Sequence, residues 1–222
     1  MKITDDLFAY PWMDAAENNC NSYYLGGDAK MLIDPGLTSF FPILQKKLAK
    51  DGIEMKDIEN LFLTHSHPDH FEAVETFLDM DNVNIIMSKE ETDFMDEVGI
   101  AFYPAFGLKT PEYRIDQFVG DGTVEIGGVT FEAFISPGHS PGSLCLLWPE
   151  KKVLISGDVI FNMNVGRSDF PGGDSALLKE SIETISKLDV DYLLPGHMDI
   201  VVGNNEVAQN FEMVKKSVFP YL

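Results

Sequence analysis

Short apolar runs alternate along the chain with segments of helical periodicity. Apolar runs bounded by turn residues predict strands over 31–33, 58–63, 84–87, 143–148, 153–155 and 192–194. Two more strands are expected within 123–135, on either side of the Gly127-Gly128 turn. Apolar positions that share one helix face predict helices over 38–48, 71–78, 177–188 and 207–218. Strands with interspersed helices predict an α/β fold with sheets in the middle and helices outside.

Two other stretches are distinguished by their composition. Residues 99–118 are aromatic and interrupted by prolines, which is typical either of a loop packed on the body of the protein or of a wall of a substrate pocket. The acidic stretch Lys89–Asp93 is interpreted as the solvated face of a helix.

The charge balance limits the partners of this protein. Lys and Arg number 16 and Asp and Glu 36, which gives a net charge of −20 over 222 residues. A surface this acidic repels phosphate backbones and anionic lipid headgroups. We therefore expect a small-molecule substrate, with neither a nucleic acid nor a membrane as partner; the sequence does not indicate an oligomeric state.

The cysteines and the N-terminal residues bear on the compartment. Cys20 and Cys145 lack the CxxC spacing of a zinc ribbon and are interpreted as small buried residues. The first residues have no basic region followed by an apolar one, and no apolar run approaches the ~20 residues that span a membrane. We expect a cytoplasmic protein, and this argues against a secreted lactamase.

The segment 64–70, Thr-His-Ser-His-Pro-Asp-His, places four metal-ligand side chains at the end of a predicted strand. His65 and His67 point the same way in extended backbone, while Asp69 and His70 enter a turn and can face the same cavity. Clustered imidazoles with a carboxylate suit zinc or iron better than calcium or magnesium. The segment therefore predicts a metal site.

The remaining histidines have a similar setting. The chain has five histidines, and His139 and His197 each follow a short strand and a Pro-Gly pair. Asp158 also lies where a predicted strand ends, in Ser156-Gly157-Asp158. An Asp or His at such a place is often only a cap or turn residue, but no histidine is left over for another role.

This ordered set resembles the metallo-β-lactamase superfamily, through Asp34 in Ile33-Asp34-Pro35-Gly36, the segment 65–70, His139, Asp158 and His197. The resemblance implies a single domain over residues 1–222, with a four-layer αββα sandwich and two metals at one edge. It also implies ligand roles for seven residues: His65, His67 and His139 for the first metal, Asp69, His70 and His197 for the second, and Asp158 as a bridge. Asp34 would orient a ligand imidazole.

Within the superfamily, Gly157–Phe161 and Gly166–Asp174 look most like the glyoxalase II and persulfide dioxygenase branch. Glyoxalase II carries an added C-terminal helical domain that helps to bind glutathione, whereas this chain ends soon after His197 and resembles the short, single-domain members. Arg167 is expected either to pair with a substrate carboxylate or to form an ion pair with Asp169 or Asp174.

The expected activity is metal-dependent hydrolysis of a thioester, as in glyoxalase II, or of a related ester. Two zinc ions can share a water and lower its pKa, so that a metal-bridging hydroxide attacks the carbonyl, with Asp69 as the catalytic base. The alternative is a mononuclear iron persulfide dioxygenase-like oxidoreductase, in which His65, His139 and Asp158 hold the single iron. As cofactors we thus expect two zinc ions or, alternatively, iron as one or two ions. A non-catalytic binding module is disfavoured because the ligand set is intact.

Overall fold

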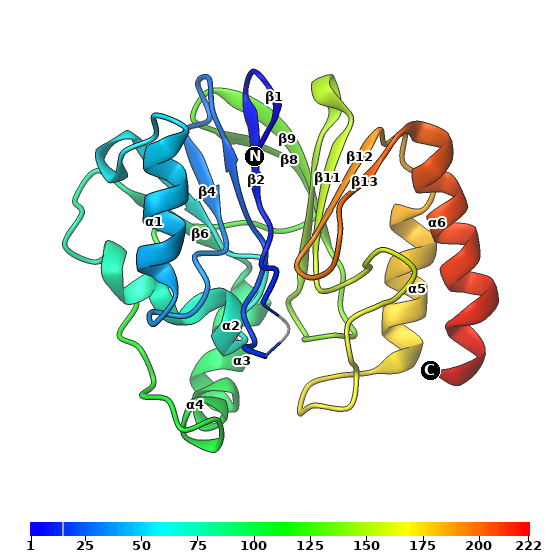
Figure 1. Cartoon of the computed structure of the whole chain (residues 1–222). Helices are drawn as coiled ribbons and strands as arrows, with labels where there is room; N and C mark the ends of the chain where they lie inside the picture. The colour runs from blue at the N-terminus through cyan, green and yellow to red at the C-terminus, as the bar shows by residue number, and fades with distance from the viewer. Residues whose placement is uncertain (15) are drawn as a thin grey trace.

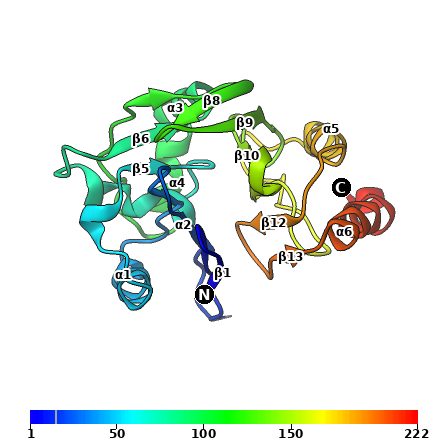
Figure 2. The same cartoon turned by 90° about the horizontal axis from the view of Figure 1, so that it is seen from above.

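The chain folds into two β-sheets that lie face to face between two layers of helices (Figure 1). The computed structural model describes residues 1–14 and 16–222. Figure 2, turned by 90°, shows α1 outside one sheet and α5 and α6 outside the other. The predicted four-layer αββα sandwich is therefore confirmed. Within the described part of the chain, no helix is long and apolar enough to cross a membrane.

The first sheet has seven strands in chain order. These are β1 (Lys2–Thr4), β2 (Leu7–Tyr10), β3 (Ser22–Leu25), β4 (Met31–Ile33), β5 (Asn60–Phe62), β6 (Asn84–Met87) and β7 (Gln117–Phe118). Pairing is antiparallel from β1 to β4 and parallel from β4 to β7. Parallel neighbours need crossover connections, and these supply the helices of the first outer layer.

The crossovers contain both α-helices and short 3₁₀ helices. They are α1 (Phe41–Lys50), η1 (Met55–Asp57), α2 (Pro68–Phe71), η2 (Glu72–Phe77), α3 (Lys89–Glu97), η3 (Gly99–Ala101) and α4 (Phe102–Ala105). The helix predicted over 71–78 thus begins three residues earlier, at the proline that follows His67, and continues as 3₁₀ helix. Proline is favoured at the first position of a helix, which accounts for the earlier start.

The second sheet has six strands and is mostly antiparallel. The strands are β8 (Gly122–Ile126), β9 (Val129–Ile135), β10 (Leu144–Trp148), β11 (Val153–Gly157), β12 (Tyr192–Pro195) and β13 (Val201–Val202). Its outer layer is formed by α5 (Ser175–Ile185) and α6 (Asn204–Ser217), and the short helices are η4 (Pro149–Lys151) and η5 (Phe219–Tyr221). Within the described residues of this sheet, only β11 and β12 pair in parallel, with α5 in the connection between them.

Buried side chains fill the three spaces between the four layers. The central cluster joins both sheets, with Ile33 and Phe62 from the first and Phe131 and Leu146 from the second. A second cluster lies between the first sheet and α1 to α4, and a third between the second sheet and α5 and α6. Both faces of each sheet are therefore buried, so a functional site is expected at the free edges or strand ends of the sheets.

Candidate metal centre

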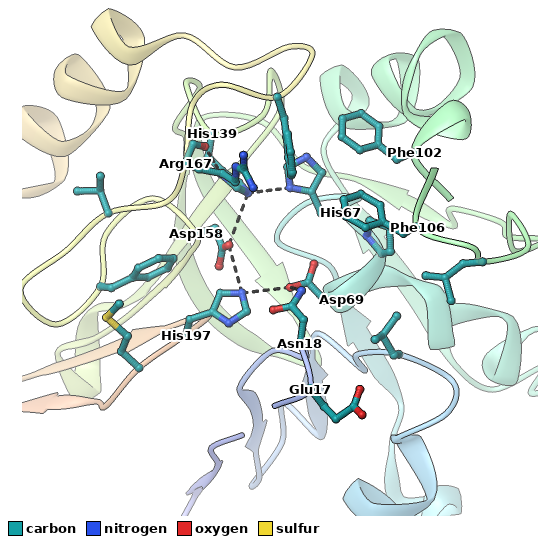
Figure 3. A pocket seen from close by; sticks show the side chains of 17 residues that line it. Glu17, Asn18, His67, Asp69, Phe102, Phe106, His139, Asp158, Arg167 and His197 are labelled. Atoms are coloured by element: carbon teal, nitrogen blue, oxygen red, sulfur yellow. Dashed lines mark hydrogen bonds and ion pairs between the residues drawn. The ribbon is translucent and has the colours of Figure 1, made fainter. Parts of the chain in front are cut away.

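Seven histidine and aspartate side chains meet at one edge of the sandwich. Figure 3 shows the five of them that line the neighbouring cavity: His67, Asp69, His139, Asp158 and His197. His65 and His67 follow β5, and Asp69 and His70 belong to α2, so these four come from the first sheet's half of the fold. His139, Asp158 and His197 follow β9, β11 and β12 of the second sheet. The structure thus brings together all the residues that the sequence predicts as metal ligands.

The first group contains His65, His67 and His139. His139 Nε2 lies 2.8 Å from His67 Nδ1 and 3.2 Å from His65 Nε2. Two ligand atoms on one zinc ion, with bonds of about 2.0–2.1 Å and tetrahedral angles, lie about 3.3 Å apart. The three nitrogens, which are all within 4.8 Å of one another, could therefore hold one ion.

The second group contains Asp69, His70 and His197. His197 Nε2 lies 3.2 Å from Asp69 Oδ2 and 3.3 Å from His70 Nε2. Asp158 lies between the groups, with Oδ1 3.2 Å from His70 Nε2 and Oδ2 3.5 Å from His139 Nε2. One carboxylate therefore faces donor atoms of both groups, as a bridging ligand must.

Hydrogen bonds on the far side of three imidazoles fix which nitrogen faces the centre. His139 Nδ1 donates to the backbone oxygen of Arg167 at 2.6 Å, and His70 Nδ1 to Asp34 Oδ2 at 2.7 Å. Thr64 Oγ1 donates to the same Asp34 oxygen and accepts from His65 Nδ1 at 3.0 Å. When His65, His70 and His139 are neutral, their Nε2 lone pairs therefore point into the centre. Lone pairs so close together repel one another unless a cation lies between them.

A buried carboxylate oxygen supports the same interpretation. Asp158 Oδ1 has no hydrogen-bond donor, although its residue is only 7% exposed. Buried carboxylate oxygens are normally hydrogen-bonded or bound to a metal. Together with the convergent nitrogens, this oxygen makes the donor set fit two metal ions. His67 Nε2 also lacks a partner, and its ring packs edge-on against Phe170 at the cavity wall.

The titration of the metal-free centre follows from burial and from the mixture of charges. Burial, reinforced by His139, lowers the pKa of His67 to about 3. Burial would also lower the pKa of His197, but the carboxylates of Asp158 and Asp69 outweigh it and raise that pKa to about 10. The pKa of Asp158 is held well below its usual value because His197 and His70 outweigh the effect of burial. Protons on these histidines must leave when a metal ion binds.

Glu91 corrects the interpretation of Lys89–Asp93 as a solvated helix face. Its side chain is fully buried, and Oε1 accepts hydrogen bonds from the Ser66 backbone N–H at 2.9 Å and hydroxyl at 2.7 Å. Oε2 accepts from the Gly142 N–H at 2.9 Å and the Ser140 hydroxyl at 2.7 Å. One carboxylate thus joins the loop of His65 and His67 to the loop of His139.

Sequence reasoning did not identify Glu91 as part of the site, although its position in the helix indicates burial. Glu91 lies in helical phase with Phe94 and Met95, and all three are buried on the same face of α3. It also missed Thr64 and Asn18; the Asn18 amide donates to Asp69 Oδ2 at 2.9 Å. Asp34, expected to orient a ligand imidazole, does contact His70. These contacts hold the orientation of the proposed ligands before any metal binds.

Arg167 takes the ion pair with Asp169 that was one of its two expected roles. Its Nε and one Nη each donate to a carboxylate oxygen of Asp169 at 2.7 Å. The guanidinium also lies 3.7 Å above the ring of Phe170. Asp174, the other candidate partner, instead caps α5 by accepting from the N–H groups of Ala176 and Leu177.

A cavity of about 690 Å³ opens in front of the centre. Figure 3 shows its lining residues, which include five of the seven. Its volume is ordinary for a small-molecule site. Phe102, Phe106 and Leu108 line it, so part of the 99–118 segment forms a cavity wall. The rest of that segment contains η3, most of α4 and β7, so it is not a plain loop.

Comparison with known proteins agrees with this geometry. The chain is 33% identical over 187 residues to a probable metallo-hydrolase of Methanocaldococcus jannaschii, covering 81% of this chain and 88% of that protein. It is 32% identical over 195 residues to the hydroxyacylglutathione hydrolase GloC of Haemophilus influenzae, covering 85% of this chain and 84% of that protein.

Two solved structures share the fold over nearly the whole chain. The BLEG-1 B3 metallo-beta-lactamase superposes with a TM-score of 0.74 at 26% identity, covering 93% of this chain and 96% of its own. The TTHA1623 protein, solved in a di-iron-bound form, superposes with a TM-score of 0.73 at 25% identity, covering 96% and 100%. The family model of the metallo-beta-lactamase superfamily matches residues 15–197, a span that includes all seven residues of the centre. The chain therefore belongs to the metallo-beta-lactamase superfamily.

Proposed function

We propose that this protein is a metal-dependent hydrolase that holds two metal ions, zinc in the first instance, and cleaves a thioester with water. The observation that carries the proposal is the convergence of donor atoms from seven residues, five of which line a cavity large enough for a small substrate. The names of the similar proteins, a metallo-hydrolase and a hydroxyacylglutathione hydrolase, support the same class of reaction.

The proposal assigns each donor group one ion. His65, His67 and His139 would hold the first ion, Asp69, His70 and His197 the second, and Asp158 would contact both. When bound, such ions supply Lewis acidity, which acidifies water and polarises a carbonyl oxygen.

The chain's own residues hold this arrangement and move the proton. Asp34 and the Arg167 backbone oxygen keep His70 and His139 in the tautomers that leave Nε2 free. Asp69 lies at the cavity wall, where it can accept a proton from the attacking water, and the Asn18 amide holds its carboxylate in place.

Water is the proposed nucleophile because the side chains that most often attack acyl groups do not line the cavity. The residues that line it, all within the described part of the chain, include no serine, threonine, cysteine, tyrosine or lysine. The two cysteines are buried, and burial raises the pKa of Cys145 to about 12, so neither is a candidate for covalent catalysis.

The proposal is tested by metal content and by two activity assays on one preparation. Protein purified anaerobically without chelator should contain two metal ions per chain and should cleave a thioester without taking up oxygen. One iron per chain, with oxygen uptake in the presence of glutathione persulfide, would overturn the hydrolase in favour of a dioxygenase. The donors around Asp69 and His197 would then need another explanation.

A further inference from the structure

Beyond the proposed metal centre, the cavity offers little positive charge for the remote part of an anionic substrate. Asp69 and Asp158 would contact the metal ions; apart from them and the histidines, Arg167 is the one cation and Glu17 the one carboxylate among the described residues that line the cavity. The net charge of the whole chain, −20, adds a long-range repulsion of anions. Recognition of a negatively charged thiol carrier, such as glutathione or coenzyme A, would therefore depend on Arg167.

The guanidinium of Arg167 already has binding partners within the protein. Both oxygens of Asp169 accept from its guanidinium at 2.7 Å, and its face is stacked on Phe170. A paired, two-bond arginine–carboxylate contact uses the geometry with which an arginine would otherwise bind a substrate carboxylate. The described residues offer the Asp169 carboxylate no partner other than Arg167, so the pair has no evident role in holding the fold.

The cavity walls favour an apolar substrate instead. Phe170 packs edge-on against Phe102 and Phe106, with ring centroids 5.5 and 6.0 Å apart. Phe161 and Met198 line the cavity as well. Phe106 is 55% exposed and Met198 48% exposed, which leaves apolar surface at the rim for a substrate to cover.

We infer that the substrate is an uncharged thioester with an apolar acyl group, and that Asp169 excludes anionic thioesters by occupying Arg167. This inference rests on the proposed thioester hydrolysis. In the reaction the oxygen of water bonds to the carbonyl carbon and the carbon–sulfur bond breaks. The sulfur takes one proton of the water, so the products are a carboxylic acid and a thiol.

The test uses one acyl group on three thiols. Phenylacetyl thioesters of N-acetylcysteamine, glutathione and coenzyme A have leaving groups of similar chemistry but differ in charge. We expect kcat/KM to be about tenfold higher for the uncharged thioester than for the glutathione thioester, and lowest for coenzyme A. This ratio corresponds to about 1.4 kcal/mol, the size of one charge-assisted hydrogen bond.

Asp169→Ala then tests the cause, with Asp189→Ala as its matched control. Asp189 also forms an exposed ion pair, with Lys152 at 2.6 Å, but Lys152 does not line the cavity, whereas Arg167, the partner of Asp169, does. Each variant raises the net charge by one. Asp169→Ala should raise kcat/KM for the glutathione thioester about five- to tenfold by lowering KM and should leave the uncharged thioester unchanged, while Asp189→Ala should change neither.

Binding measured without turnover gives an independent readout. The Kd of the corresponding phenethyl thioether of glutathione, measured by calorimetry, should fall by the same factor in Asp169→Ala and stay constant in Asp189→Ala. A preference of the unmodified protein for glutathione or coenzyme A, or equal effects of the two variants, would overturn the inference and leave the hydrolase proposal standing. Failure to cleave any of the three thioesters would instead refute the proposed function itself.

Discussion

The substitution Glu91→Gln tests how the centre is held in shape. The side chain keeps its volume, but one oxygen becomes an amide group that donates hydrogen bonds. Whichever way the amide faces, one buried backbone N–H, that of Ser66 or that of Gly142, points at the amide nitrogen and loses its acceptor. The serine hydroxyl on that side can accept a hydrogen bond from the amide instead of donating one, but the backbone N–H can only donate.

The magnitude follows from these contacts. An unsatisfied buried donor costs about 1–3 kcal/mol. The two bonds that remain to the amide oxygen are no longer charge-assisted, and each loses about 1 kcal/mol. The free energy of unfolding of the metal-free protein should fall by about 3–5 kcal/mol, a large share of the about 5–15 kcal/mol that is usual for a folded domain.

Metal affinity should respond at one group of donors and not at the other. Ser66 lies between His65 and His67, and Ser140 follows His139, so a displaced Ser66 or Ser140 moves the first group. Loss of such outer contacts commonly lowers metal affinity about 10- to 100-fold. Asp69, His70 and His197 make no contact with Glu91 and should bind as before.

Urea denaturation of the metal-free protein and competition with a chromophoric chelator would measure both effects. Asn60→Ala is a suitable control, because Asn60 lies at the start of β5, away from the centre, and its buried side chain donates to the backbone oxygen of Ala29. It should lower stability without changing metal affinity. The reasoning fails if Glu91→Gln changes the unfolding free energy by less than about 1 kcal/mol, or if both metal affinities stay the same.

Three further predictions concern the same centre. Asp34→Asn should lower the metal affinity of the second group about 10- to 100-fold, measured by chelator competition, because its single amide oxygen cannot accept from both His70 Nδ1 and the Thr64 backbone N–H; an unchanged affinity would contradict this role. In the metal-free protein the raised pKa of His197, about 10 against 6.5, stabilises the fold fully below pH 6.5, so the thermal midpoint should fall as the pH rises from 6.5 to 10, and a flat profile would argue against it. Cys145 should resist alkylation at pH 8 until the protein is denatured, since burial raises its pKa to about 12, and rapid labelling of native protein would refute this.

The parts of the fold that were predicted correctly are those with a local signal. β6 and the pair β8 and β9 follow apolar runs with clear turns, and the helices α5 and α6 follow an apolar stripe. The N-terminal strands β1 to β3 were not predicted. They have only three or four residues each, and β3 is buried along its whole length, so it lacks the alternation that marks a half-buried strand.

The residues of the candidate site likewise divide into those that the sequence predicted and those that it did not. The donors were found because His65 to His70 are close together in the sequence and the other three follow Pro-Gly or Gly at strand ends. The groups that hold them were not found, because their contacts join distant parts of the chain. Glu91 meets Ser140 across 49 residues, and Asn18 meets Asp69 across 51. No pattern within a single element encodes such a contact, whereas the topology of two sheets creates it.

The centre lies on the boundary between the two sheets, which links metal binding to the fold itself. Without metal, that boundary near the centre relies on contacts such as those of Asn21 and Tyr23, which donate to the Pro195 backbone oxygen at 3.1 and 2.6 Å. These contacts hold the loop of His197 against β3 from the other sheet. Ions that bind donors from both sheets add to this attachment, and a ligand that binds only the folded state stabilises it by mass action. The donors that the sequence places far apart therefore serve both the chemistry of the cavity and the joining of the two halves.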